Sequence, residues 1–479
     1  MESGLQLKLL TTEEITTIYE KCQEVLSKKG MKIDHPHALK MLDKAGARVD
    51  FESRQVRFPK DIIKAALDNV PQRFLLAGRD ERHDIVLPDP NGAFHVRNGS
   101  GAFRYFDPES DVFRYATLAD VKACAQFVEA LDEIRFCAFP SPTDAPKQSA
   151  DIHALKILFE NTSKHINVQP YSAESVEYLL ELAQVVAGSA ALSMRPIISL
   201  SPNAFTPLGL KAYDVEVILQ STRLGVPIHC WSLPSAGATS PITIAGSILL
   251  MGVEILCMIV LSQLLQPGTP VIANPFPFTT DMATGNSLNS SVEVTLTTAA
   301  AVEYIKRAYR VPVHTYGFGT DSPITDGQAS TETTLKGLMA SLAGADLLSG
   351  AGMVESINGF SLIQLLVDSN LVSLLKRLNR GVKVDDDTLA WKEIMNTDPG
   401  GHFLERTHTF EHCREALRPK LFIHQEWEVW SSEGKKNLYS RAFEEYKVIK
   451  DSLQPHPLPE DVRKELNLII KKADEKLVK

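Results

Sequence analysis

Short apolar runs alternate with longer helical patterns through the middle of the chain, and this alternation constrains the fold more than any other feature. Eight apolar runs occur, at residues 93–97, 135–139, 165–169, 196–200, 227–231, 270–273, 312–316 and 346–349. Helical patterns lie near 118–132, 149–162, 173–187, 209–224, 242–266, 287–309, 328–343 and 361–379. Repeated strand–helix units make right-handed crossovers between parallel strands. Eight such units predict an α/β protein built as a closed (β/α)8 TIM barrel.

The regions on either side of the barrel have different patterns. The barrel is expected to occupy residues 91–384, with a hairpin-like insert at 99–115 after a weak first strand. Because that strand is weak, an open doubly wound sheet is the competing architecture. Residues 1–90 show helical patterns at 12–28, 36–45 and 59–69, which predict an N-terminal helical cap. Residues 385–479 predict a C-terminal helical extension that ends in a charged amphipathic helix.

Charge and cysteine usage limit the function classes and the compartment. The chain has 50 Lys and Arg against 59 Asp and Glu, a net charge of -9, so a general basic surface for nucleic acid is not expected. The six cysteines form no C-x-x-C pair, which indicates reduced thiols rather than a disulfide framework. The first ten residues lack the basic and apolar regions of a secretory signal. We therefore expect a cytoplasmic protein.

Residues 242–266 form an apolar helical stretch long enough to imitate a membrane span. Glu254 lies at its middle, where a lone carboxylate is costly in a bilayer, and no basic residues flank the stretch. A buried helix is therefore expected, with no contact to a membrane. Barrel helices normally keep a polar outer face, and this one barely does. We expect a second subunit or another domain to cover it, and hence a homo-oligomer that associates through this helix.

The positions that follow the strands are unusually aromatic for a chain with only 7% aromatic residues. In TIM barrels the reacting groups lie at this C-terminal face. The candidate substrate-binding residues are Phe139, Tyr171, Asn203, Trp231, Asn274, Phe276, His314, Tyr316, Phe318 and Glu332. An aromatic mouth with few carboxylates suits a cationic ligand without N–H donors, such as a quaternary ammonium. Any one of these rings could instead fill the barrel top and support a loop.

Three other patterns were weighed as sites. The glycine turns at 317–319 and 350–352 follow the last two strands, where many barrels bind phosphate, but neither is a Walker loop or a full GxGxxG motif. His402, His408 and His412 invite a metal interpretation, yet no H-E-x-x-H motif and no cysteine pair accompanies them. We expect tight turns, packing histidines and no bound metal. No G-x-S-x-G elbow of a serine hydrolase occurs.

Several stretches of the chain resemble a single family. They are GARVDFESRQVRFPKDIIKAAL (46–67), SAGATSPITIAGS (235–247), PITDGQASTE (323–332), GAGMVES (350–356), SLIQLLVDSNL (361–371), GHFLERTHTFEH (401–412) and RPKLF (418–422). In order and spacing they resemble the trimethylamine methyltransferase family, over nearly the whole chain. One departure is Ile363-Gln364, where many relatives have Glu-Gln. This departure leaves the substrate preference open, because the position is either structural or functional.

The resemblance implies a (β/α)8 barrel that moves a methyl group from an amine to the cobalt of a separate corrinoid protein. Trimethylamine enzymes of the family carry pyrrolysine, and this sequence has none. It therefore resembles the pyrrolysine-free branch, whose members demethylate quaternary amines such as glycine betaine, proline betaine, carnitine and γ-butyrobetaine. Glycine betaine is our first expectation. A quaternary nitrogen leaves as a neutral amine and needs no general acid, so the demand on the protein is to place one methyl group in line with the Co(I) nucleophile.

The chemistry of the candidate residues suggests a role for each as a hypothesis. Trp231, Phe276, Tyr316 and Phe318 would surround the ammonium group. Asp321, Glu332 or Glu355 could add compensating charge, and Asn203, Asp321 and Glu355 could help to position the methyl group. A betaine carboxylate would need donors, for which Arg97, Asn203, Asn274 and His314 are available; Asn203 is the first choice because it follows the fourth strand.

Two other function classes stay open at this point. The glycine turns allow a barrel enzyme that acts on a phosphorylated metabolite. An aromatic cage without catalytic groups allows a protein that only binds a quaternary amine. Ligand tests separate the three functions. The methyltransferase requires a quaternary amine together with Co(I), the second enzyme should bind phosphate, and the binding protein should bind the amine without turnover.

Overall fold

The fold is a barrel of eight parallel strands. The computed structural model describes residues 6–188, 191–454 and 456–478. The strands are β6 (His95–Asn98), β9 (Ile134–Cys137), β10 (His165–Val168), β11 (Ile198–Leu200), β13 (Ile228–Ser232), β15 (Val271–Pro275), β18 (His314–Tyr316) and β19 (Leu347–Ala351). Each pairs in parallel with the next along the chain, and β19 pairs with β6. Between β15 and β18 the ring closes through the Ala273 amide, which donates to the Pro312 carbonyl at 2.9 Å. The predicted TIM barrel is confirmed.

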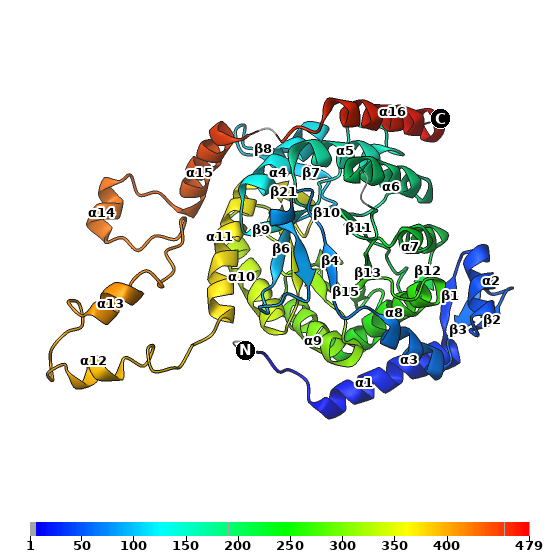
Figure 1. Cartoon of the computed structure of the whole chain (residues 1–479), viewed down its shortest axis with the longest axis horizontal. Coiled ribbons are helices and arrows are strands. Elements are labelled where there is room, and N and C mark those ends of the chain that lie inside the picture. Colours follow the sequence, from blue (N-terminus) through cyan, green and yellow to red (C-terminus); the bar gives the residue numbers. More distant parts are fainter. Residues whose placement is uncertain (1–5, 189–190, 455, 479) are drawn as a thin grey trace.

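Eight helices surround the strands in the order that the sequence predicts (Figure 1). They are α4 (Leu118–Ala130), α5 (Ala150–Asn161), α6 (Ala173–Ala187), α7 (Ala212–Leu224), α8 (Ile244–Leu265), α9 (Val292–Tyr309), α10 (Gly327–Leu342) and α11 (Leu362–Asn379). Side-chain caps fix where several of them begin. Thr117 and Asp120 form a capping box at α4, and the Asp326 side chain accepts from the Ala329 amide at α10.

A hairpin fills the N-terminal end of the barrel. It consists of β4 (Phe74–Leu76) and β5 (Ile85–Leu87). Three of its side chains, Leu76, Ile85 and Leu87, form one apolar cluster with Phe136, Ile272 and Leu347 of the barrel strands. Since this cluster is fully buried, the polar part of the interior lies toward the other end, where the strands finish.

The N-terminal segment contains the predicted helices and also strands that the prediction left out. The helices are α1 (Thr12–Glu24), continued by the π-helical turn η1 (Val25–Lys29), α2 (Pro36–Lys44) and α3 (Lys60–Asn69). Between them lie β1 (Met31–Ile33), β2 (Arg48–Asp50) and β3 (Gln55–Arg57). The short strand β1 pairs in parallel with β12 (Gly209–Leu210) in the loop after β11. Each strand has three residues, too few to show an alternating pattern in the sequence.

The apolar helix α8 is covered from outside by this N-terminal segment. It is the one helix in the described residues that is long and apolar enough to cross a membrane, and most of it is buried between the barrel and α1, α2 and α3. Of the two predicted covers, a second subunit or another domain, the structure shows the second. The helix therefore gives no ground for the predicted homo-oligomer.

Glu254, at the middle of α8, faces the barrel and not a bilayer. Its carboxylate accepts hydrogen bonds from Ser232 Oγ at 2.6 Å, from Thr206 Oγ1 at 2.9 Å and from the Leu208 amide at 2.9 Å. Burial raises its pKa above the ordinary carboxyl value. The carboxylate thus ties α8 to β13 and to the loop after β11.

Two small sheets lie at the C-terminal ends of the barrel strands. The first joins β20 (Met353–Val354), β21 (Gly359–Ser361), β7 (Arg104–Asp107) and β8 (Val112–Tyr115), so the predicted insert at 99–115 is indeed a hairpin. The second joins β14 (Ser235–Ala236), β16 (Phe278–Thr280) and β17 (Ser287–Leu288). Together they frame the barrel mouth.

After α11 the chain leaves the barrel as a long arm and then returns (Figure 1). Residues 380–437, here called the arm, contain the short helices α12 (Trp391–Met395), α13 (Thr407–His412) and α14 (Trp427–Ser432). The chain then forms α15 (Leu438–Ser452), which lies on α11 and α4, and α16 (Glu460–Leu477), which lies on α6 and α5.

The cover over α8 predicts a stability difference between two helical glycines. A methyl group added at Gly252 in α8 would lie 2.9 Å from Cys22 Sγ and 2.9 Å from Tyr304 Cε1. Gly252→Ala should therefore destabilise the protein by about 1–3 kcal/mol, in spite of the better helix propensity of alanine. At Gly327 in α10 nothing lies within 4 Å, so Gly327→Ala should be neutral or stabilising. Thermal unfolding of both variants measures this, and equal midpoints would contradict the close packing of α1 on α8.

Candidate functional site

The upper interior of the barrel is polar, which is unusual because branched apolar side chains normally fill a TIM barrel. Seven of the fully or almost fully buried polar residues on its strands are Arg97, His165, Asn167, Ser199, His229, Asn274 and His314. Contacts across the ring show that their side chains point inward. His229 of β13 and His314 of β18 meet through their Nδ1 atoms at 2.9 Å, although β15 lies between the two strands.

Arg97 is the most costly of these residues. Its side chain is completely buried, and none of its three guanidinium nitrogens makes a hydrogen bond of good geometry in the part of the chain that the structure describes; the Tyr316 hydroxyl is its nearest polar partner and is close enough to interact with it. Tyr316 lies beside the guanidinium, and burial lowers the pKa of Arg97. An unpaired charge in the interior normally costs several kcal/mol. A planar cation with free donors at this depth is suited to bind an anion, above all a carboxylate.

Three aromatic side chains form a cluster at the same level. The rings of Phe276 and Tyr316 stack with their centroids 4.0 Å apart and an interplanar angle of 9°. Trp231 meets both edge-on, at 5.8 Å from Phe276 and 5.9 Å from Tyr316. Its indole Nε1 is buried without a partner among the described residues. The structure thus brings together three of the predicted aromatic residues. One of them, Tyr316, is also a neighbour of Arg97.

A chain of hydrogen bonds holds the three interior histidines. His165 Nδ1 donates to the Ala77 carbonyl at 3.0 Å, so its Nε2 must accept from Ser199 Oγ at 2.9 Å. The Ser199 oxygen then accepts from His229 Nε2 at 2.9 Å. In this neutral tautomer His229 Nδ1 carries no proton, so it accepts a hydrogen bond from His314 Nδ1.

The tautomers that follow leave His314 with a free lone pair. Its Nε2 is buried and has no partner in the described chain. Burial lowers the pKa of His165 to about 4 and the pKa values of His229 and His314 well below 6.5, so all three rings are neutral. Asn274 contacts His314 Nδ1 at 2.9 Å, and with that nitrogen protonated its amide oxygen must face the ring. Arg97 is therefore the cation of this interior.

Several predicted residues lie elsewhere. The Phe318 ring lies against α10, with its Cζ 3.5 Å from a methyl group placed on Gly337, and its place around the ligand beside Trp231 stays a prediction. Asp321 accepts from the amides of Asn289 and Ser290 at 2.8 and 2.9 Å. These bonds fix the turn before α9.

The other two predicted acids are also engaged by the protein itself. Glu332 accepts from the Asp321 amide at 2.8 Å and from Thr320 Oγ1 at 2.5 Å. Glu355 forms an ion pair with Arg104 of β7 at 3.0 Å. The acids thus hold the loops around the mouth, and the sequence could not show this because each partner is distant or belongs to the backbone.

Phe139, Tyr171 and Asn203 lie at the edge of the site. The rings of Phe139 and Tyr171 are 6.4 Å apart, and the Tyr171 hydroxyl donates to Ser141 Oγ at 2.7 Å. Asn203 forms a bridge to Trp231 after β11, and its buried Oδ1 lacks a partner within the described ranges. Asn203 thus keeps a place near the aromatic cluster, but its amide is a weaker anion donor than the guanidinium of Arg97.

The glycine turns after the last two strands serve packing. Gly350 has a φ of 97°, and a methyl group there would lie 2.5 Å from the Phe318 carbonyl oxygen. Gly352 has a φ of 86°, and a methyl group there would lie 2.8 Å from Cε2 of the Phe360 ring. Both positions need glycine for close approach and for the left-handed backbone, which agrees with the prediction of tight turns.

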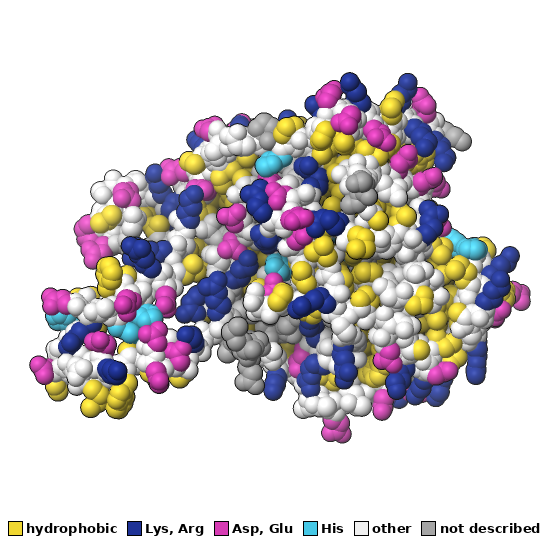
Figure 2. Space-filling model, viewed as in Figure 1, with side chains coloured by type: hydrophobic (Ala, Val, Ile, Leu, Met, Phe, Trp, Pro, Cys, Tyr) yellow, Lys and Arg dark blue, Asp and Glu magenta, His cyan; other side chains and the backbone are white. Residues whose placement is uncertain are grey.

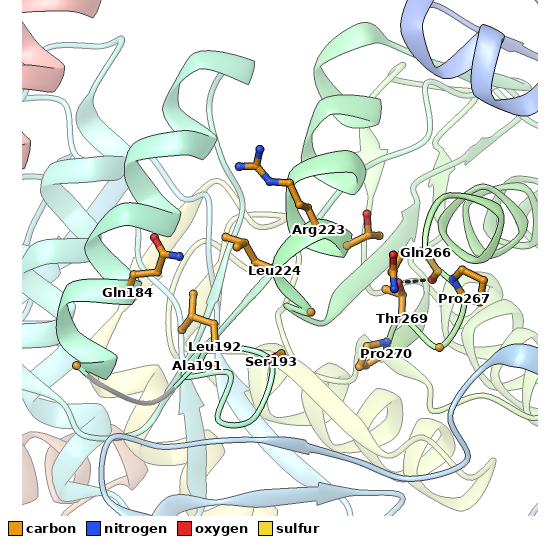
Figure 3. Close-up of a pocket in the computed structure, with 14 residues that line it drawn as sticks. Gln184, Ala191, Leu192, Ser193, Arg223, Leu224, Gln266, Pro267, Thr269 and Pro270 are labelled. Atoms are coloured by element: carbon orange, nitrogen blue, oxygen red, sulfur yellow. Dashed lines mark hydrogen bonds between the residues drawn. The ribbon is translucent and has the colours of Figure 1, made fainter.

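A surface hollow of about 670 Å³ lies at the opposite end of the barrel (Figure 3). Its lining includes Leu192, Gly225 and Pro270, from the segments that lead into β11, β13 and β15. It therefore opens at the N-terminal face, where residues of TIM barrels serve stability rather than chemistry. We place the candidate site in the polar interior at the other end.

The family model described as "Trimethylamine methyltransferase (MTTB)" matches residues 3–477. The chain is 33% identical over 474 residues to the trimethylamine methyltransferase MttB of Desulfitobacterium hafniense, covering 98% of this chain and 95% of the relative. It is 26% identical over 467 residues to the glycine betaine methyltransferase of the same species, strain Y51, covering 96% of each.

A solved structure supports the fold alone. The monomethylamine methyltransferase MtmB of Methanosarcina barkeri aligns with a TM-score of 0.53 and 12% identity, over 94% of this chain and 95% of that one.

Because its guanidinium is buried without a charged partner among the described residues, Arg97 is expected to lower the free energy of unfolding of the ligand-free protein. Arg97→Met, which removes an unpaired buried cation at nearly constant volume, should leave the free energy of unfolding unchanged or raise it. Arg195→Met is the matched control, because Arg195 donates to both oxygens of Asp84 at 3.0 and 2.9 Å. It should lose about 1–3 kcal/mol. Denaturant unfolding measures both, and an equal loss in the two variants would show that Arg97 has a partner in the free protein.

Proposed function

The chain belongs to the trimethylamine methyltransferase family, and we propose that it moves a methyl group from a carboxylate-bearing quaternary amine, with glycine betaine first, to Co(I) of a separate corrinoid protein. Proline betaine, carnitine and γ-butyrobetaine belong to the same ligand class. The observation that carries the proposal is the buried, unpartnered guanidinium of Arg97 next to the aromatic cluster of Trp231, Phe276 and Tyr316.

The charge of Arg97 supports a zwitterion over a simple amine cation. A second positive charge about 6 Å away would be opposed by about 3 kcal/mol at an effective dielectric constant near 20. Trimethylammonium brings no negative charge to offset this. A betaine brings its own carboxylate, which can accept paired hydrogen bonds from the guanidinium and screen it from the ammonium group.

The aromatic cluster supports a quaternary nitrogen. Such a nitrogen has no N–H to donate, so ring faces must hold it. Trp231 and the stacked pair of Phe276 and Tyr316 supply apolar and quadrupolar surface in a water-excluding position, since all three are almost fully buried. They do not supply an acid or base, and the departure of a neutral tertiary amine requires neither.

The residues of this chain would act by positioning. Arg97 would fix the carboxylate end of the ligand, and the rings would fix the ammonium end, so that one methyl group faces the mouth. The corrinoid supplies the nucleophilic metal. A partner protein must then reach the mouth, and its rim offers apolar surface: Phe103, Tyr115 and Phe205 are 41%, 63% and 56% exposed.

One further observation favours a hydroxylated member of the ligand class. The free Nε2 of His314 can accept a hydrogen bond and cannot donate one, because its Nδ1 carries the proton. A betaine with a hydroxyl group, such as carnitine, could satisfy it. Glycine betaine has no such group and would leave the nitrogen to a water molecule.

An anaerobic spectral assay tests the proposed function. The protein is mixed with a reduced corrinoid protein and one amine at a time: glycine betaine, proline betaine, carnitine, γ-butyrobetaine or trimethylamine. We expect the Co(I) absorption to disappear with at least one betaine and to persist with trimethylamine. Arg97→Met should reduce the rate by 100-fold or more, because a lost bidentate charged contact costs about 3 kcal/mol.

The same assay identifies the competing functions. The corrinoid protein must first be shown to be active with another methyltransferase. Methylation by trimethylamine at the rate of the betaines would contradict the role of Arg97. Betaine binding by calorimetry without any methyl transfer would indicate a binding protein, and binding of phosphate alone would indicate an enzyme of phosphorylated metabolites.

A pair of aromatic substitutions tests the placement of the rings. Trp231→Leu should weaken betaine binding about 10-fold or more, because it removes one ring face from the ammonium group. Phe318→Leu is the control, since the Phe318 ring lies against α10. It should lower stability and leave the dissociation constant unchanged. Calorimetric titration measures both variants, and equal weakening would return Phe318 to the site.

A further inference from the structure

The arm at residues 380–437 has almost no hydrophobic core. Leu421 is the one buried residue in it, while Val382, Leu404 and Phe410 are 89%, 82% and 78% exposed. Three helical turns of five or six residues cannot stabilise such a segment by themselves. Segments this poor in buried surface commonly depend on a disulfide or a metal ion. The structure shows no disulfide among the described cysteines.

Three side chains of the arm have the identity and spacing of metal ligands. One ligand atom each from Asp387, His408 and His412 lie within 4.8 Å of one another. The two histidines are four residues apart on α13, so they share a helix face, and their ring centroids are 4.2 Å apart. Asp387 comes from a separate loop 21 residues before His408. An ion held by all three would join the loop that contains Asp387 to helix α13.

In each histidine ring, one nitrogen also lies within hydrogen-bond distance of an oxygen atom, as is usual for metal-ligating histidines in proteins. His412 Nδ1 lies 2.6 Å from Glu415 Oε1, and its Nε2 faces Asp387 Oδ2 at 3.5 Å. His408 Nε2 lies 3.0 Å from the main-chain oxygen of Asp387. A carboxylate behind one ring and a carbonyl behind the other would set their tautomers and make the free nitrogens better ligands. Figure 2 shows histidine and acidic side chains gathered on this arm.

We propose that Asp387, His408 and His412 bind a divalent transition-metal ion, of which zinc(II) fits best, and that this ion fastens the arm. Two imidazoles and one carboxylate form a usual set for zinc, with bonds of about 2.0–2.2 Å and a fourth position for water. Tetrahedral ligands at that distance lie about 3.3 Å apart. The three side chains therefore need to close by about 1–2 Å, which rotation of the exposed Asp387 and small shifts of the two half-buried histidines allow. Glu415 would hold His412 from outside the coordination sphere.

This assignment reverses the expectation from sequence that these histidines only pack. The competing explanation is a protonated His412 that forms ion pairs with Asp387 and Glu415 and needs no metal. Both explanations use the same contacts, but only the metal site requires His408. The proposal is independent of the methyl transfer reaction, because none of its residues belongs to the barrel.

Metal content and zinc binding test the proposal. The full chain is stripped with a chelator, and zinc chloride alone is titrated by calorimetry and followed by elemental analysis. We expect about one zinc per chain in the wild type, and a loss of at least 30-fold in affinity in His408→Ala and in His412→Ala. His402→Ala is the matched control, a histidine of the same arm outside the cluster, and should bind as the wild type does.

A second readout reports the arm directly. Zinc should slow cleavage of residues 380–437 by a low concentration of protease in the wild type and in His402→Ala, but not in His408→Ala. Wild-type protein that binds no zinc, or binding that survives both substitutions, would overturn the proposal. So would zinc-dependent protection that is equal in His408→Ala and His402→Ala. Since the barrel does not rest on the arm, the variants should remain folded, and circular dichroism confirms this before titration.

Discussion

The choice of ligand depends on one unfavourable interaction, a guanidinium that is buried inside the barrel and has no charged partner among the described residues. Arg97 costs the free protein stability that a methionine or leucine would not cost. Around it the fold supplies neutral histidines, amides and aromatic rings, and within the described ranges Tyr316 and Cys137, not a carboxylate, are the titratable groups that act on it. A ligand that brings an anion recovers that energy as binding energy, whereas an amine cation meets repulsion. This asymmetry is the physical basis for expecting a zwitterion.

The architecture keeps this interior closed from every side except the mouth. The hairpin of β4 and β5 fills the N-terminal end with apolar side chains. The N-terminal segment buries the apolar helix α8, and Glu254 on its inner side ties that helix to β13. The predicted acids Asp321 and Glu355 hold the loops of the mouth. These two acids, which the sequence suggests as positioning residues, contact the loops of the mouth, and we propose that the interior residues of the strands form the site.

Sequence patterns predicted the barrel because each strand and helix carries its own local signal, and all eight pairs lie where the apolar runs place them. The same pattern predicted aromatic residues at the ends of the strands, and the structure brings the rings of Trp231, Phe276 and Tyr316 into contact. The direction of a side chain after a strand ends has no such period, so the sequence could not show that the Phe318 ring lies against α10. Arg97 was named as one donor among four, because the sequence cannot show that it lacks a partner. The contact of Asp387 with His408 and His412 crosses a loop of 21 residues and has no local signal.

The central claim is that the buried cation selects a ligand carrying its own carboxylate. Calorimetric titration of the wild-type protein with glycine betaine and with tetramethylammonium tests it most directly, since both have a quaternary nitrogen and only the first has a carboxylate. We predict binding of glycine betaine, or of a longer betaine, at least 100-fold tighter than that of tetramethylammonium, with the preference lost in Arg97→Met. Equal affinities in the wild type, or a preference that persists without Arg97, would contradict the account.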